Sequence, residues 1–369
     1  MNRRTFARAS LATAAAAATG GCVRKSELVA RTAAAAGNLP EVTWLLASSF
    51  LHTLDTIHGA AECLAKRVAS LTQGRFKIKV HGPGELCTAT QVLDVVQQGA
   101  VPIGHTASYY YMGKHPALAF DTTVPFGLDA RQQNAWLTQA GGAEVLKPIF
   151  DSFNIVCFPG GNTGVQMGGW YRREINSIAD LQGLKMRIPG LGGQVMSAMG
   201  VTVQNLAPGE IYTALQMGAI DATEWVGPYD DLRLGLHQVA KYYYYPGWWE
   251  PGPGLCFYIN RDAWEALPEV YRSVLECAAA EASARMMAQY DAKNPVAFKE
   301  LVEKHHVQVR PFPADLINKA REVATAKLDE FAAGNEGFAK VYTHWKAFRA
   351  LSLSWTSTAE YAHARGAAR

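Results

Sequence analysis

The feature that most limits what this chain can fold into is an alternation of short strand-like and helix-like segments, which occurs twice along the sequence. The strand-like stretches are apolar or alternate between apolar and polar residues, and the helix-like stretches repeat apolar residues every three or four positions. The first block predicts strands at 42–46, 76–80 and 102–104 and helices at 57–71 and 91–98. This β-α-β-α-β order indicates a mostly parallel sheet covered by helices.

The same pattern starts again at residue 154, after a turn-rich region. The second block predicts strands at 154–158, 185–188, 201–203 and 220–222 and helices at 192–199 and 209–217. The sequence therefore predicts two α/β lobes in tandem. Ligands of open α/β sheets bind beyond the carboxyl ends of the strands, so two such lobes place a ligand cleft between them.

The rest of the chain reads as helical, with periodic apolar residues over 263–287, 317–331 and 338–348. Such helices would brace the two lobes or form a dimer contact. We predict an export signal and linker at 1–36, a first lobe at 37–158, a second lobe at 159–254, and a return to the first lobe with bracing and C-terminal helices at 255–369.

The N-terminus predicts export. Paired Arg3-Arg4, a following Phe6 and an alanine-rich run over 9–18 resemble a twin-arginine signal, and the apolar run is too short to span a membrane. The segment 19–22 resembles a lipoprotein cleavage box ending at Cys22, but with Thr19 in the place of the usual Leu. Cleavage within the alanines at 33–36 is the alternative.

Charge and motifs exclude several function classes. The chain carries a net charge of +3, of which residues 1–36 contribute +5, so the remainder is near −2 and lacks the basic footprint of a nucleic-acid binder. There is no H-E-x-x-H, G-x-S-x-G or G-x-x-x-x-G-K-[ST] motif. The glycines at 190–193 hint at a dinucleotide loop, but Val195 stands where a small residue is needed. Five cysteines follow Cys22 without a C-x-x-C pair, and we expect them to act as small apolar residues.

Three segments combine polar or aromatic residues with positions next to predicted strands. Segment 160–170 holds five glycines, which let the backbone approach a ligand. Arg187 ends a predicted strand and could bind a carboxylate through two parallel hydrogen bonds, or form a structural ion pair. Glu224 lies beside Trp225 and could anchor a loop or hold a hard cation. The aromatic block 242–250 reads mainly as core between the lobes, with one Trp, such as Trp249, available to wall the pocket.

These same segments resemble the periplasmic binding subunits of tripartite ATP-independent periplasmic (TRAP) transporters, of the DctP type, and within them the branch that binds 2-oxo acids such as pyruvate. The resemblance runs from about Val42 to the C-terminus. It rests on runs 161–170, 186–187, 223–231 and 243–250, and on the shorter runs 84–86, 109–111 and 124–128. It implies a two-lobed α/β periplasmic binding protein fold with a ligand cleft between the lobes.

The resemblance also implies roles for single residues. The family's carboxylate-binding arginine corresponds to Arg187. In the branch that uses a metal, the side chains of Gln166 and Glu224 and the backbone carbonyl of Trp225 hold a sodium or calcium ion. Substrate contacts are expected from Gln166, Arg187 and Trp225, together with Asn162 and Trp249. One departure is that Pro189-Gly190-Leu191 stands where the family pattern has Gly-Gly-Phe. The proline stiffens the loop beside Arg187 and removes an N–H group, which bears on the identity of the acid.

We therefore expect a periplasmic solute-binding protein, not an enzyme, that closes on a small 2-oxo or 2-hydroxy monocarboxylate with a bridging cation and then docks on membrane permease subunits. A homodimer through the C-terminal helices is a further possibility. One alternative is a binding protein for another solute, such as a dicarboxylate or an amino acid, and a second basic group in the cleft would favour the dicarboxylate. The other is an exported enzyme, which needs a general acid–base pair that the sequence does not offer at a recognisable spacing.

Overall fold

The computed structural model describes residues 39–367. The chain divides into two units, Met1–Val42 and Thr43–Arg369, and all that follows concerns the second. The predicted export signal, the lipoprotein box at Cys22 and the cleavage sites lie outside the described residues. No helix between residues 39 and 367 is both long and apolar enough to cross a lipid bilayer.

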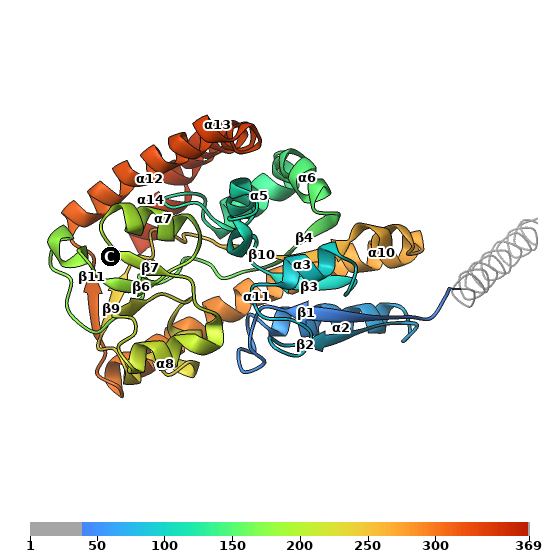
Figure 1. Ribbon diagram of the computed structural model, residues 1–369, viewed down its shortest axis with the longest axis horizontal. Coiled ribbons are helices and arrows are strands. Elements are labelled where there is room, and N and C mark those ends of the chain that lie inside the picture. The colour runs from blue at the N-terminus through green and yellow to red at the C-terminus, as the bar shows by residue number, and fades with distance from the viewer. Residues whose placement is uncertain (1–38, 368–369) are drawn as a thin grey trace, which may run out of the picture. The chain divides into compact units, whose positions relative to one another are not determined.

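The first sheet has five strands, in the order β2-β1-β3-β10-β4. Their bounds are β1 Val42–Ser48, β2 Phe76–His81, β3 Ile103–Thr106, β4 Ile155–Asn162 and β10 Gly254–Asn260. Helices α2 (Gly59–Leu71) and α3 (Val92–Gln97) connect the first strands, as the first predicted block requires (Figure 1). The strand β10 therefore comes from far along the chain and lies between β3 and β4.

The second sheet has six strands, in the order β11-β9-β5-β8-β6-β7. Their bounds are β5 Trp170–Tyr171, β6 Lys185–Arg187, β7 Thr202–Gln204, β8 Ala222–Thr223, β9 Tyr242–Tyr245 and β11 Gln308–Pro311. Helices α7 (Gly190–Ala198), α8 (Ile211–Gln216) and α9 (Pro228–Arg233) follow β6, β7 and β8. The other elements of the second predicted block are thus present, but its first strand, predicted at 154–158, is β4 of the first sheet. The α/β fold class is confirmed.

The expectation of a mostly parallel arrangement holds only in part. Strands β1 and β3 are parallel, as are β9 with β11 and β6 with both β7 and β8. However, β10 runs antiparallel to both β3 and β4, and β5 runs antiparallel to both β8 and β9. Both sheets are therefore mixed.

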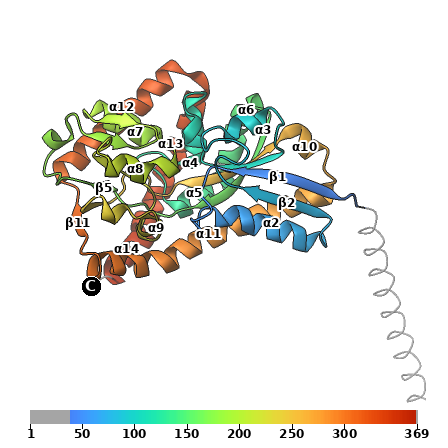
Figure 2. The same cartoon turned by 60° about the horizontal axis from the view of Figure 1, so that its bottom comes forward.

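The C-terminal part is helical, but it contributes to both sheets. Its longest helix, α11 (Glu269–Glu303), packs against α2, β4 and α9, so it contacts elements of both lobes (Figure 2). Helix α12 (Ala314–Gly334) packs against α7 and against α13 (Glu336–Thr358), and α14 (Glu360–Ala367) follows. Strand β11 joins the second sheet beside β9, so this part of the chain supplies a strand to the second sheet as well as β10 to the first.

The turn-rich region before residue 154 contains helices that the sequence analysis did not predict. These are α4 (Ala119–Thr122), α5 (Ala130–Gln139) and α6 (Gly142–Ser152). Helix α10 (Arg261–Glu265), which follows β10, overlaps the start of the predicted helical segment 263–287. Helix α5 begins with a reciprocal cap, in which Asp129 accepts from the backbone N–H of Gln132 and the Gln132 side chain accepts from that of Asp129. The remaining domain boundaries stay predictions.

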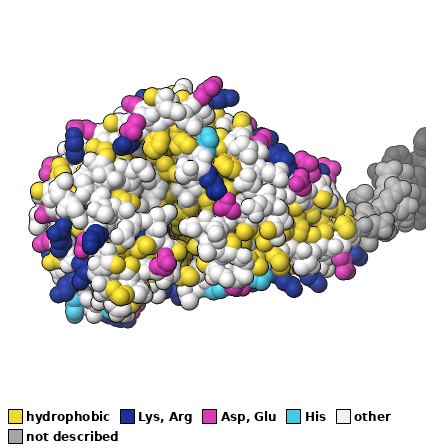
Figure 3. All heavy atoms as spheres, viewed as in Figure 1, with side chains coloured by type: hydrophobic (Ala, Val, Ile, Leu, Met, Phe, Trp, Pro, Cys, Tyr) yellow, Lys and Arg dark blue, Asp and Glu magenta, His cyan; other side chains and the backbone are white. Residues whose placement is uncertain are grey.

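On the face shown in Figure 3, charged side chains of both signs are interspersed, without one large basic patch. This agrees with the near-neutral charge of the chain beyond residue 36.

Candidate functional site

Arg187 and Glu224 meet because two neighbouring strands of the second sheet end at the same edge. Strands β6 and β8 are parallel, with Arg187 opposite Thr223. Arg187 is the last residue of β6, and Glu224 follows the last residue of β8. The carboxyl ends of parallel strands carry the ligand groups in open α/β sheets. Each of the two side chains is only 1% exposed.

The two side chains form a buried ion pair between Arg187 Nη1 and Glu224 Oε1. Arg187 Nε also donates to the carbonyl oxygen of Leu206 at 3.3 Å, and its guanidinium carbon lies 5.6 Å from the centre of the Trp225 ring. Arg187 Nη2 and Glu224 Oε2 are both buried without a hydrogen-bond partner. Buried polar atoms are seldom left unpaired, so the pair retains one free donor and one free acceptor.

Gln166 provides a second free oxygen. Its Nε2 donates to the Thr163 hydroxyl at 3.1 Å, and its backbone N–H donates to the carbonyl oxygen of Glu250 at 3.1 Å. The side-chain oxygen Oε1 is buried without a partner. Thr163 thus fixes the orientation of the amide, so that the oxygen is the atom left free. The sequence analysis did not single out Thr163.

The first lobe contributes aromatic groups from the 3-10 turn Ser108–Tyr111. Tyr109 and Tyr110 line the cavity, and their rings stack with centroids 5.0 Å apart. Gly190 has a φ of +65°, and a Cβ atom there would collide with the Tyr109 ring. Glycine at this position therefore lets the tyrosine approach the loop after Arg187.

The cavity between these groups is small, at about 10 Å³, which is room for about one water molecule. An acid of three carbon atoms can therefore enter only if the lobes separate or the lining side chains move. The lining residues come from both lobes and from the segments that connect them: Phe50, Ile57, Ala107, Tyr109, Tyr110, Thr163, Gln166, Arg187, Trp225, Val226, Pro253 and Leu255.

Glu250 is a second buried carboxyl group in this region, and the sequence analysis did not assign it a role. It is 2% exposed, and its Oε2 has no hydrogen-bond partner. Burial, reinforced by the charge of Glu224, raises the pKa of Glu250 well above its usual range. Burial also raises the pKa of Glu224 to about 7, against the opposing effect of Arg187. Two carboxyl groups near one guanidinium leave the site receptive to a further positive charge.

Two of the predicted contact residues do not line the cavity. Asn162 is tied to the backbone, since its Nδ2 donates to the carbonyl oxygen of Gly252 and its Oδ1 accepts from the N–H of Gly164. Trp249 is 1% exposed and packs against Trp248 and Phe312 in the second lobe. Gln166, Arg187 and Trp225 line the cavity. Glu224 does not line it but pairs with Arg187, and Asn162 and Trp249 lie outside the lining.

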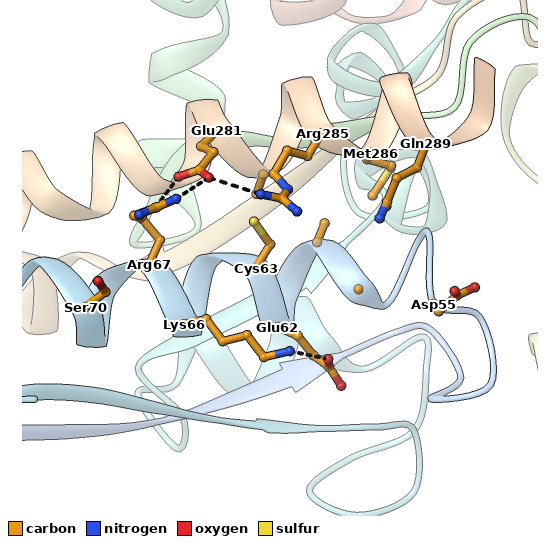
Figure 4. A pocket seen from close by; sticks show the side chains of 13 residues that line it. Asp55, Glu62, Cys63, Lys66, Arg67, Ser70, Glu281, Arg285, Met286 and Gln289 are labelled. Atoms are coloured by element: carbon orange, nitrogen blue, oxygen red, sulfur yellow. Dashed lines mark hydrogen bonds and ion pairs between the residues drawn. The ribbon is translucent and has the colours of Figure 1, made fainter. Parts of the chain in front are cut away.

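A larger groove lies elsewhere, between α2 and α11, and shares no lining residue with the cavity. Figure 4 shows its charged groups pairing with one another: Arg67 and Arg285 from opposite sides both approach Glu281, and Lys66 pairs with Glu62 on its own helix. Because these charges are already compensated, the groove is a weaker candidate for a solute site than the cavity around Arg187.

Comparisons with known proteins identify the family of this chain. Residues 47–335 match the DctP family model, described as bacterial extracellular solute-binding protein, family 7. A protein of Nostoc sp. named monocarboxylate 2-oxoacid-binding periplasmic protein is 50% identical over 332 residues, which are 90% of this chain and 91% of that protein.

Solved structures of solute-binding proteins from TRAP transporters are similar to this chain. A TRAP transporter solute-binding protein from Bordetella bronchiseptica, described as a mixed-occupancy dimer with copurified calcium and picolinate, superimposes with a TM-score of 0.88 at 44% identity, over 89% of this chain and 97% of that one. A TRAP periplasmic solute-binding protein from Pseudoalteromonas atlantica with bound sodium and pyruvate gives 0.86 at 40% identity, over 88% and 99%. This chain therefore belongs to family 7 of the bacterial extracellular solute-binding proteins.

Proposed function

We propose that this protein is the periplasmic subunit of a TRAP transporter and that it captures a small 2-oxo or 2-hydroxy monocarboxylate together with a sodium or calcium ion. The observation that carries the proposal is a set of buried polar atoms without hydrogen-bond partners. Arg187 Nη2 and Gln166 Oε1 belong to residues that line the cavity, and Glu224 Oε2 belongs to the carboxylate paired with Arg187. A donor on a guanidinium fits a carboxylate, and two free oxygens fit a hard cation.

In this proposal Gln166 Oε1, Glu224 and the backbone carbonyl of Trp225 hold the cation. The cation supplies positive charge to the oxygens of the acid, while Arg187 binds its carboxylate. Sodium and calcium are hard cations, and they bind amide, carboxylate and carbonyl oxygens in preference to sulfur ligands. The names of the Nostoc protein and of the pyruvate- and picolinate-bound structures support this class of solute and of ion.

The lining of the cavity favours a monocarboxylate over a dicarboxylate. Arg187 is the one Lys or Arg side chain among its lining residues, and the others that carry polar groups are neutral. A second carboxylate would be buried without a cationic partner, which is costly. The rival dicarboxylate proposal therefore lacks the second basic group that it needs.

A thermal-shift screen tests the proposal. Small acids are added to metal-stripped protein with sodium, with calcium or with neither. A 2-oxo monocarboxylate plus cation should raise the unfolding temperature most, because a ligand at 100 times its Kd adds about 2.7 kcal/mol of stability. A larger shift with succinate or with an amino acid would contradict the proposed solute class.

Thr163 is expected to act as a positioning residue for Gln166. In Thr163→Val the amide loses the hydroxyl that holds its Nε2, so its oxygen is no longer fixed toward the cavity. The loss of one buried hydrogen bond is worth about 1 kcal/mol, which is roughly fivefold in acid affinity in the presence of cation. Calorimetric titration of the acid in the presence of cation measures this affinity.

Thr163→Ser keeps the hydroxyl and should bind the acid as tightly as the wild type. An equal loss of affinity in both variants would show that the packing of the threonine methyl group matters, not its hydrogen bond to Gln166.

We also propose that two copies associate through the C-terminal helices. Leu351 and Trp355 are 75% and 66% exposed on α13, four residues apart on one helix face, and the Bordetella structure is described as a dimer. Replacing both by Glu should convert a dimer into a monomer in light scattering, whereas Met217→Glu, at a comparably exposed residue directly after α8, should not. A wild-type monomer would contradict the proposal.

Periplasmic delivery by a twin-arginine signal rests on Arg3 and Arg4. Replacing both by Lys should leave the precursor in the cytoplasm, as measured by cell fractionation. Unchanged delivery would argue against the signal type. Incorporation of labelled palmitate that is lost in Cys22→Ser would establish the lipid anchor. The loaded protein is then expected to dock on the permease subunits of its transporter.

A further inference from the structure

A second group of possible metal-ligating side chains lies in the first lobe, away from the residues that line the cleft cavity. It consists of Asp121 in α4, Cys157 on β4 and Cys256 on β10. One carboxylate oxygen and the two sulfur atoms all lie within 4.8 Å of one another. We propose that these three residues bind a zinc ion at the floor of a surface pocket.

The two cysteines are placed to share a metal ion more readily than to form a disulfide. On the antiparallel strands β4 and β10, Cys157 lies opposite Tyr258 and Cys256 lies opposite Pro159, so the cysteines are diagonal neighbours. Diagonal Cα atoms on antiparallel strands are about 7–8 Å apart, whereas disulfides rarely bridge more than about 7 Å. Both cysteines are free thiols in the structure.

Asp121 is held so that one of its oxygens faces the sulfur atoms. The Ser108 hydroxyl donates to Asp121 Oδ2, and the Tyr258 hydroxyl donates to Ser108 Oγ at 2.6 Å. The other oxygen, Oδ1, lies 3.9 Å from Cys157 Sγ. Outer hydrogen bonds of this kind orient ligands in metal sites. Ser108 Oγ also lies 3.2 Å from Cys256 Sγ, so one hydroxyl contacts two of the three proposed ligands.

An entry path is present. A pocket of about 680 Å³ lies between α5, α6 and β4, and its walls include Leu146, Phe150 and Ile155. Asp121 and Cys157 line this pocket, and Cys256 lies behind them on the next strand. The pocket shares no lining residue with the cleft cavity. An ion can therefore reach these ligands from solvent while the two lobes stay closed.

The ligand types decide which cation fits. Two thiolates and one carboxylate suit zinc, which takes sulfur and oxygen ligands at about 2.0–2.3 Å in a tetrahedral arrangement. The same set disfavours sodium and calcium, which take oxygen ligands only. Binding replaces the protons of the two thiols, which pass to solvent. The fourth position would face the pocket and take a water molecule.

The experiment uses full-length mature protein, stripped of metal and kept reduced with a phosphine. Zinc is titrated in competition with a chromophoric chelator, and cobalt is added separately to look for the thiolate-to-cobalt absorption band. We expect one tightly bound zinc per chain and a cobalt band. Cys157→Ser and Cys256→Ser should each weaken zinc binding by about 100-fold or more, since loss of even an outer-shell partner costs up to about 100-fold.

Cys63→Ser and Cys87→Ser, at half-buried cysteines elsewhere, serve as matched controls and should keep full affinity, as should Glu224→Gln in the cleft. Thermal unfolding checks that each variant is folded, and Asp121→Asn provides a nearly isosteric third variant. The proposal is overturned by zinc affinity that is equal in wild type and the two cysteine variants. It is also overturned by the absence of a cobalt band, or by a Cys157–Cys256 disulfide found by mass spectrometry in protein from the periplasm.

Discussion

Arg187→Ala is expected to weaken binding of the acid by roughly 30-fold to several thousand-fold. Removing one partner of a buried, hydrogen-bonded charge pair costs about 2–5 kcal/mol, and Arg187 is the cationic side chain that lines the cavity. Arg187→Lys should also bind poorly, because a point charge cannot reproduce the two parallel hydrogen bonds of a guanidinium. Calorimetry with pyruvate in excess cation measures both effects.

The same substitution affects folding stability, which has to be separated from binding. Arg187 and Glu224 form an ion pair that is 1% exposed on each side, so Arg187→Ala leaves a buried carboxyl group unpaired and should cost about 3–5 kcal/mol of stability. The double variant Arg187→Met plus Glu224→Leu removes both charges and should regain much of that stability without regaining acid binding. Near-wild-type affinity in folded Arg187→Ala would remove Arg187 from the site.

Glu224→Gln is expected to abolish most of the dependence of acid binding on added cation. In the wild type that dependence should be about 5–150-fold, the usual range for coupling between two bound ligands. Without an ion, the ionised Glu224 repels the carboxylate of the acid in a site shielded from water. Removing its charge removes both the cation ligand and this repulsion, so the affinity with and without calcium should converge at a weak value.

Glu62→Gln is the matched control for this prediction, because Glu62 is an exposed glutamate on α2, away from the cavity, that pairs with Lys66. It should keep the full cation dependence. If Glu224→Gln keeps it as well, Glu224 serves only as the structural partner of Arg187, and the cation is held elsewhere.

The position of the site could be predicted from local pattern because it depends on strand ends. Arg187 and Glu224 each stand at the carboxyl end of a segment with a recognisable strand signal, and parallel pairing of β6 with β8 brings such ends together. Their direct ion pair was not predictable in the same way. It depends on side-chain geometry between residues 37 positions apart, and the sequence analysis left ligand contact and ion pair as open alternatives.

Residues that position another residue of the site were not predicted from the sequence. Thr163 orients Gln166 through one hydroxyl contact, and threonine in a glycine-rich loop carries no distinguishing signal. Glu250 ends the aromatic block, and a charged residue among apolar neighbours is a signal from which a functional role could have been predicted. Asn162 and Trp249 were assigned to the pocket because their segments reach it, but the direction of a side chain depends on packing that a segment does not reveal.

The fold itself was predictable to the level of its repeated α/β blocks, but not to the order of its strands. The insertion of β10 between β3 and β4, and of β5 between β8 and β9, depends on pairing between distant segments. Local periodicity carries no information about such pairing. Helix α5 was missed although its cap, Asp129 with Gln132, is a recognised start signal, because its apolar periodicity is weak.

The most direct test of this account is calorimetric titration of pyruvate into metal-stripped wild-type protein, without cation and then with saturating sodium or calcium. We expect that one of these ions raises the affinity for pyruvate, and that pyruvate raises the affinity for that ion by the same factor. Equal affinity for pyruvate in the presence and absence of both ions would contradict a cation bridging Gln166, Glu224 and the bound acid.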